Sequence, residues 1–210
     1  MQKVDPRMEQ KLSSCFKTGV LEAGCDEAGR GCLAGPVVAA AVILPADYSH
    51  PVLNDSKKLD EQTRYRLREE IVQCAISWSV AFVDSTEIDR INIYRASMLA
   101  MHKAISKLSV IPEHLIIDGN KFIKYGTIPH KCIVKGDSKY FSIAASSVLA
   151  KTYRDDFMLN IHNEFSCYAW DRNKGYATIS HREAIKIYGL SPYHRRSFRL
   201  RDSQLDIEFR

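Results

Sequence analysis

Residues 20–44 read VLEAGCDEAGRGCLAGPVVAAAVIL, and this stretch decides the fold class. Residues 20–26 have the pattern of a short strand, and Gly29-Arg30-Gly31 predicts a turn after it. Residues 37–44 form an apolar run rich in β-branched side chains that Pro45 closes, which predicts a buried strand. Residues 76–83 alternate and predict a third strand, so we expect an antiparallel meander at the start of the fold.

Further along the chain, helices alternate with strands. Helices are predicted over residues 60–74, 85–108, 142–164 and 178–188, and strands over residues 114–118 and 130–134. Asp60 is expected to cap the first helix, whose apolar side would be formed by Leu67, Ile71 and Cys74. This order predicts an α/β fold with a central mixed sheet and helices on its faces.

The length and composition favour one compact unit. The chain has 210 residues, of which 45% are hydrophobic and 26% charged, and its net charge of +5 permits a polyanionic partner without requiring one. The six cysteines form no C-x-x-C pair, the polar N-terminus has no signal-peptide core, and the longest apolar run, residues 34–46, is too short for a membrane span. We therefore expect a reduced cytoplasmic protein that is neither secreted nor embedded in a membrane.

Acidic residues stand at the ends of two predicted strands and on one predicted helix. Asp26 and Glu27 end the first strand, Asp118 ends the strand at 114–118, and Asp155 follows Lys151 by one helical turn. Taken singly, Asp26 and Glu27 are better explained as a polar turn and Asp155 as a surface ion pair, whereas Asp118 is equally explained as part of an Asp-Gly turn. Taken together, four converging carboxylates would repel one another unless one or two divalent cations held them, which indicates metal-assisted phosphoryl transfer.

The geometry of the first pair sets a condition. Neighbouring strand residues point to opposite faces, so Asp26 and Glu27 are expected to serve one site only if the backbone turns at Glu27. Gly29 and Gly31 make such a turn plausible and would let the backbone approach a ligand closely. A dinucleotide-binding loop is excluded, because these glycines lead into a strand and not into a helix.

Several stretches, in order, resemble the ribonuclease HII family over roughly residues 20–200. They are CDEAGRGCLAGPVVAAAVIL (25–44), NDSKKL (54–59), IDGN (117–120), KGDSK (135–139), IAASSVLAKTYRD (143–155), NKGYATISH (173–181) and SPYHRRSF (191–198). The related ribonuclease HIII has a glutamate at the position of Asp155 and an additional N-terminal substrate-binding domain. The aspartate and the short segment before the first motif both favour ribonuclease HII.

The resemblance implies a ribonuclease H-like fold with a five-stranded mixed sheet and a small helical C-terminal part. It implies an N-terminal extension at residues 1–19, a catalytic core at 20–164 and a helical subdomain with a basic tail at 165–210, packed as one unit. The implied metal ligands, for Mn²⁺ or Mg²⁺, are Asp26, Glu27, Asp118 and Asp155. The backbone of Gly29, Arg30 and Gly31 would read the ribose 2′-hydroxyl, and Tyr176 would stack near the ribonucleotide.

The expected substrates are RNA–DNA hybrids and duplex DNA with embedded ribonucleotides, cut on the 5′ side of the ribonucleotide to leave 3′-hydroxyl and 5′-phosphate ends. Phosphate contacts are expected from basic residues, although the C-terminal ones are equally explained as a solvated basic terminus. These residues are Lys57, Lys58, Lys135, Lys139, and Arg195, Arg196, Arg199 and Arg201 of the tail at 194–201. His181 and His194 are expected to be structural, and a monomer is expected.

Two other interpretations remain open at this point. One is a non-catalytic nucleic-acid-binding protein on the same scaffold, and the other is a strand-transfer nuclease of the same superfold. The acidic residues argue against the first, because a binder of polyanions has no use for convergent carboxylates. Cleavage of an all-DNA duplex would distinguish the second.

Overall fold

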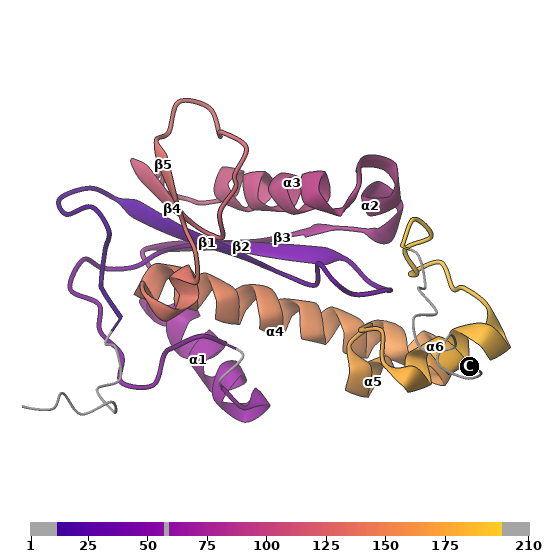
Figure 1. Cartoon of the computed structure of the whole chain (residues 1–210). Helices are drawn as coiled ribbons and strands as arrows, with labels where there is room; N and C mark the ends of the chain where they lie inside the picture. The colour runs from indigo at the N-terminus through magenta and orange to yellow at the C-terminus, as the bar shows by residue number, and fades with distance from the viewer. Residues whose placement is uncertain (1–11, 57–58, 199–210) are drawn as a thin grey trace, which may run out of the picture.

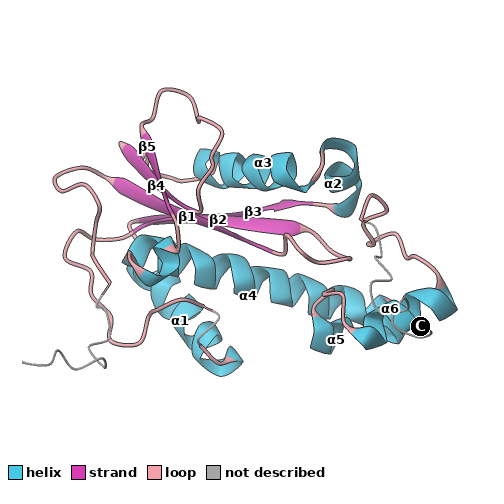
Figure 2. Cartoon of the chain, viewed as in Figure 1, coloured by secondary structure: helices cyan, strands magenta, loops and turns pink. Residues whose placement is uncertain are grey.

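The computed structural model describes residues 12–56 and 59–198, which form a five-stranded mixed sheet with helices on both faces (Figure 1 and Figure 2). The strand order is β3-β2-β1-β4-β5. The strands are β1 (Glu22–Ala28), β2 (Val37–Ile43), β3 (Ser77–Val83), β4 (His114–Asp118) and β5 (His130–Ile133). The predicted fold class and all the predicted strands are confirmed, with boundaries that differ by a residue or two.

The sheet topology places two carboxyl ends side by side. β1, β2 and β3 pair antiparallel in chain order, which confirms the predicted meander. β4 pairs with the other edge of β1 in parallel, and β5 pairs in parallel with β4. Since parallel strands end at the same edge of a sheet, the residues that close β1 and β4 can contribute to one site.

Each face of the sheet carries its own helices. α3 (Ile93–Ser106) packs on one face, and α4 (Phe141–Glu164) lies along the other with α1 (Glu61–Cys74) beside it (Figure 2). Successive residues of β2 alternate between these layers: Ala39 and Ala41 belong to the core under α3, and Ala40 and Val42 to the core under α4. Fully buried strands on both faces explain the continuous apolar run in the sequence.

Local signals fix the helix ends. The Asp60 side chain accepts a hydrogen bond from the Thr63 N–H at 2.7 Å, and the Thr178 hydroxyl does the same for His181 at the start of α6 (Ile179–Tyr188). Leu67 and Ile71 of α1 are buried as predicted, whereas Cys74 is exposed, so its assignment to the apolar side was wrong. α6 ends at Gly189, whose φ of 76° continues no right-handed helix.

The predicted helix over residues 85–108 is wrong in one respect: it is divided into α2 (Ser85–Ile91) and α3. The break lies at Asn92, which has a φ of 68° and a ψ of 162°. Asparagine tolerates positive φ better than other side chains, and its Oδ1 accepts a hydrogen bond from the Arg95 N–H at 3.1 Å. A single residue therefore ends one helix and caps the next.

The described part of the C-terminal region packs against the end of α4. It contains the short helices η2 (Ser166–Tyr168) and α5 (Trp170–Asn173), followed by α6, in agreement with the expected helical C-terminal part, although no bounds were predicted for the two short helices. Their apolar side chains join Met158 and Ile161 of α4 in a third hydrophobic cluster centred on Trp170. None of the helices in residues 12–56 and 59–198 combines the length and apolarity that crossing a bilayer would require.

Candidate active site

Two acidic side chains leave β1 on different sides of the sheet. β1 continues through Ala28, which pairs with Val38, so the turn expected at Glu27 does not exist. By strand alternation, Asp26 lies on the α4 side with Ser147, and Glu27 lies on the α3 side. The backbone turns only at Gly29, with a φ of 91°. Both carboxylates nevertheless line one cavity of about 240 Å³, because the strand ends directly after them.

Asp118 joins this pair through the register of the sheet. Cys25 of β1 lies opposite Ile117 of β4, and Asp26 and Asp118 are the residues that follow in each strand. The Asp118 Oδ1 accepts a hydrogen bond from the Gly136 N–H at 2.7 Å, which fixes the side chain at the end of β4. Parallel pairing therefore brings together two carboxylates that are 92 positions apart in the sequence.

The electrostatics of this strand end are unfavourable for its carboxylates. Burial raises the pKa of Asp26 well above its usual range, and the neighbouring charges of Glu27 and Asp118 raise it further. Burial also raises the pKa of Glu27, although its ion pair with the Arg30 guanidinium at 3.0 Å acts in the opposite direction. Excess negative charge at a strand end is relieved by a bound cation or by a proton.

Asp155 has a different partner. It is buried on α4, and both of its carboxylate oxygens accept hydrogen bonds from the Lys151 ammonium, at 2.5 and 2.6 Å. Lys151 lines the cavity that contains Asp26 and Glu27, whereas Asp155 does not. In the part of the chain that the structure describes, no three histidine, cysteine, aspartate or glutamate side chains are grouped closely enough to hold a metal ion. The structure thus brings three of the expected acidic residues to one strand end, and the role of Asp155 stays a prediction.

Two further segments complete the cavity. One is the Gly29-Arg30-Gly31 backbone, and the other carries Tyr176, whose side chain is half exposed. Gly29 has no room for a side chain, since a Cβ there would overlap the Arg154 guanidinium, whereas a Cβ on Gly31 would meet nothing within 4 Å. A second cavity of about 280 Å³ shares Glu27 and Arg30 with the first. Its other lining residues are Tyr94, Met98, Asp118, Gly119, Asn120 and Lys121.

Comparison with known proteins identifies the family. Residues 23–201 match the family model described as Ribonuclease HII. The chain belongs to the ribonuclease HII family. A ribonuclease HII of Bacteroides fragilis is 59% identical over 189 residues, which cover 90% of this chain and 94% of that protein. As a member of this family the protein is an endonuclease of the ribonuclease H class, which hydrolyses RNA in RNA–DNA hybrids.

Solved structures are similar in fold. The ribonuclease HII of Archaeoglobus fulgidus, whose structure was determined in a complex with PCNA, superposes with a TM-score of 0.72 and 26% identity over 89% of this chain and 98% of that one. The ribonuclease H2 of Pyrococcus horikoshii gives a TM-score of 0.73 with 22% identity over 84% and 93% of the two chains. The ribonuclease H-like fold expected from the motifs is therefore confirmed.

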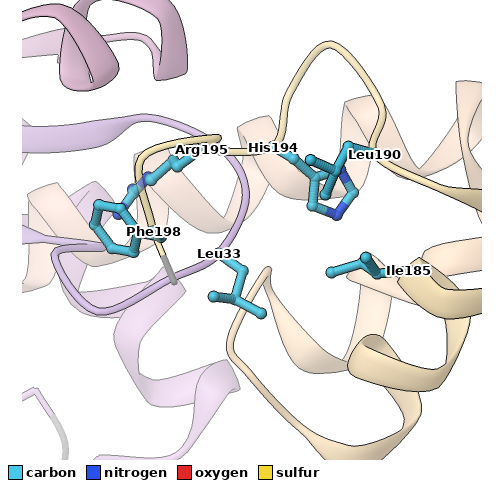
Figure 3. Close-up of a pocket in the computed structure, with 6 residues that line it drawn as sticks. All are labelled: Leu33, Ile185, Leu190, His194, Arg195 and Phe198. Carbon is cyan, nitrogen blue, oxygen red and sulfur yellow. The ribbon is translucent and has the colours of Figure 1, made fainter. Parts of the chain in front are cut away.

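Arg195 is placed differently from the expectation for this ribonuclease HII. It was expected to contact phosphate, but it is 2% exposed and its guanidinium donates to the carbonyl oxygens of Gly35, Arg30 and Gly29 at 3.0, 2.9 and 2.7 Å. In Figure 3 its side chain lies beside the Phe198 ring, at 5.1 Å from the guanidinium carbon to the ring centroid. Arg195 thus has a structural role, because its guanidinium donates to three backbone carbonyl oxygens instead of to a phosphate.

The other expected basic residues divide into two groups. Arg196, Lys135 and Lys139 are exposed, so their phosphate contacts stay predictions. Lys57, Lys58, Arg199 and Arg201 lie outside the described residues. Sequence reasoning also missed several cavity residues, namely Ser56, Tyr94, Asn120, Lys121, Ser147 and Lys151. Asn120 follows Asp118 in the IDGN stretch and could have been found from it, but Tyr94 has no local signal.

His181 and His194 are buried and structural, as expected. The Trp170 indole N–H donates to the His181 Nε2 at 3.1 Å, and the two histidine Nε2 atoms also lie 3.1 Å apart. Burial lowers the pKa of both imidazoles, that of His194 to about 4. The Tyr176 carbonyl oxygen lies 2.8 Å from the His181 Nδ1, so this pair supports the segment that carries Tyr176.

Proposed function

We propose that the protein cuts the phosphodiester bond on the 5′ side of ribonucleotides embedded in duplex DNA, in addition to the RNA strand of RNA–DNA hybrids, and leaves 3′-hydroxyl and 5′-phosphate ends. One observation carries this proposal: three carboxylates at the ends of β1 and β4 share a strand end with the Gly29-Arg30-Gly31 backbone and the Tyr176 ring. Acidic groups that suit a cation thus lie beside groups that suit a ribose.

The residues present fit a divalent cation by their donor chemistry. Asp26, Glu27 and Asp118 offer hard oxygen ligands, and burial together with neighbouring carboxylates raises the pKa values of Asp26 and Glu27, which supports a bound cation as the partner of these groups. In the described residues these three carboxylates are not grouped closely enough to hold an ion, so they would hold Mg²⁺ or Mn²⁺ after side-chain movement that brings them together, with Asp155 as a fourth ligand once it is released from Lys151. A bound ion would supply Lewis-acid activation of water and stabilisation of the leaving oxygen.

Recognition of the ribose is assigned to the two segments opposite the carboxylates. A 2′-hydroxyl is the group that distinguishes RNA from DNA, and it both donates and accepts hydrogen bonds. The backbone at Gly29–Gly31 offers peptide groups to the cavity, and neither glycine adds a side chain there. The exposed face of Tyr176 offers a surface on which a sugar or base can pack. Lys151, on the wall of the same cavity, is placed to approach a phosphate.

A DNA duplex with a single ribonucleotide tests the proposal most directly. We expect Mg²⁺- or Mn²⁺-dependent cleavage on the 5′ side of that ribonucleotide and no cleavage of the matched all-DNA duplex. Cleavage of both duplexes would favour a strand-transfer type of nuclease. Binding to both without cleavage under either metal would favour a non-catalytic nucleic-acid-binding protein.

A further inference from the structure

Two buried arginines converge beneath the segment that leads from β1 to β2. Arg154 comes from the middle of α4 and is 1% exposed, and Arg195 comes from the C-terminal region and is 2% exposed. Together they donate six hydrogen bonds, all to backbone carbonyl oxygens. Cations are rarely buried at this depth without a specific task, because their desolvation is costly.

Arg154 connects two segments that line the active-site cavity. Its Nε and Nη2 donate to the carbonyl oxygens of Pro36 and Ala34 at 3.0 and 3.1 Å, and its Nη1 donates to that of Lys174 at 2.9 Å. Lys174 lies two residues before Tyr176, whose ring centroid is 6.0 Å from the Arg154 guanidinium carbon. One planar group thus fixes the β1–β2 segment relative to the segment that carries Tyr176.

Arg195 holds the beginning of the same β1–β2 segment. Its three donors reach the carbonyl oxygens of Gly29, Arg30 and Gly35, of which the first two lie in the stretch assigned to the ribose. Burial and the nearby Arg154 charge lower the pKa of Arg195 to about 10, so the guanidinium remains protonated at neutral pH. The positive charge therefore persists under the turn, where all three hydrogen bonds depend on it.

Backbone hydrogen bonds tie the segments together directly. The Leu33 N–H donates to the Gly175 carbonyl oxygen at 2.8 Å, and the Gly35 N–H donates to that of Tyr193 at 2.9 Å. Gly175 has a φ of 83°, and a Cβ there would come within 2.6 Å of the Ala34 carbonyl oxygen. The segments at 29–36 and 173–176 are thus in direct contact through their main chains, in addition to the bridge that Arg154 makes.

We propose that Arg154 and Arg195 are positioning residues for ribose recognition, because they fix the 29–31 backbone and the Tyr176 segment in one relative arrangement before substrate binds. This inference rests on the proposed function and assigns a further task to residues that do not touch the substrate. Lysine cannot replace either arginine, since a single ammonium lacks the planar set of donors that reaches three carbonyls at once. Displacements of about 1 Å in such a site can cost about 100-fold in rate.

Single-turnover cleavage of the duplex with one ribonucleotide tests the assignment, using Arg154→Lys and Arg195→Lys. We expect the rate constant for cleavage to fall by about 10- to 100-fold in each variant, with a much smaller change in the enzyme concentration needed for half saturation. The matched control is Arg172→Lys, because the side chain of Arg172 is 88% exposed on the neighbouring α5. The control is expected to cleave at the wild-type rate.

The amplitude of the single turnover separates positioning from folding. A purely structural arginine would lower the amplitude, which reports the folded fraction, and leave the rate constant unchanged; that result would overturn the inference. A folded variant that cuts at the wild-type rate would overturn it as well. If the wild-type enzyme itself does not cut this duplex, the proposed function fails instead, so the two failures are distinguishable.

A double-mutant cycle with Tyr176→Ala gives a second readout. If Arg154 acts through the Tyr176 segment, removal of the tyrosine ring should cost less in the Arg154→Lys background than in the wild type. Additive losses of cleavage rate in the double variant would contradict an action of Arg154 through the Tyr176 segment.

If neither lysine variant folds, amide hydrogen exchange in the wild-type protein tests whether the segment is fixed before substrate binds. The amides of Leu33 and Gly35 are expected to exchange slowly in the free enzyme. Exchange as fast as in an unstructured chain until substrate is added would overturn the inference.

Discussion

The end of β1 and β4 and the C-terminal region use buried polar groups in opposite ways. At the strand end, burial and neighbouring carboxylates raise the pKa values of Asp26 and Glu27 above their usual range. In the C-terminal region, His181 and His194 are buried but fully engaged with one another and with neighbouring groups. The first arrangement costs stability, as expected for groups proposed to bind a cation, and the second uses hydrogen bonds to support its neighbours.

Asp26→Asn should give the largest effect on the cleavage rate, and it tests most directly whether the strand end and the C-terminal region differ in this way. We expect cleavage to fall by more than about 100-fold, because even the partners of metal ligands cost 10- to 100-fold when they are changed. The free energy of unfolding without divalent metal should stay equal or rise, since the substitution removes a repelling charge. Cleavage rates and urea unfolding in EDTA measure the two quantities; a strongly destabilised variant would contradict the assignment of this group to the chemistry.

Gly29→Ala compared with Gly31→Ala is the next largest test. Gly29 has a φ of 91° and its Cβ would overlap Arg154, so alanine there should lower the free energy of unfolding by about 1–3 kcal/mol. Gly31 is the matched control for stability, because a Cβ at that position meets nothing within 4 Å. The denaturant midpoints of both variants measure this difference. Equal losses of unfolding free energy at the two glycines would show that contact with Arg154 does not fix the conformation of the turn.

The two regions should also respond to pH in opposite directions. The pKa of His194 falls from 6.5 to about 4 on folding, so the unfolded chain binds the extra proton between these values. The contribution of His194 to stability is therefore complete above about pH 6.5 and is lost as the pH falls toward 4. For Asp26, whose pKa is raised on folding by burial and by the neighbouring carboxylates, the sign is reversed, because protonation removes the buried charge.

Urea unfolding between pH 7 and pH 4.5 measures this dependence. His194→Gln should flatten the loss of stability on acidification, because it removes the group that titrates. Asp26→Asn should steepen the loss, because it removes the opposing contribution. The same slope in all three proteins would mean that neither group governs the acid stability.

Arg196→Ala should give the smallest effect. Arg196 is exposed, and the hydrogen bond that the structure gives it, to Asp89 at 2.9 Å, comes from its backbone N–H and survives the substitution. If its side chain contacts one phosphate, the slope of log affinity against log salt concentration should decrease by about one, with little change in cleavage rate at saturation. An unchanged slope would remove Arg196 from the nucleic-acid surface.

The sequence alone was sufficient to predict the strands, most helix ends and the three acidic residues that lie together at the ends of β1 and β4. Asp60 caps the helix that it was expected to cap, the helix over residues 178–188 ends before Gly189 as expected, and the apolar runs at residues 37–43 and 115–117 lie in buried strands. Local patterns suffice for these features, because hydrogen bonds near helix ends and the alternation of strand faces depend on neighbours in the sequence.

Only the tertiary structure decided what the buried charges do. The sequence placed Arg195 among phosphate contacts, and the structure packs it against three carbonyl oxygens instead. For Asp155 the sequence offered both a metal-ligand role and an ion pair with Lys151, and the structure shows the ion pair. It also showed that Asp26 and Glu27 share a cavity without the turn that strand geometry seemed to require. The physical reason is that the partner of a charged side chain comes from whatever the fold brings within about 3 Å, and that distance is not encoded in any local pattern.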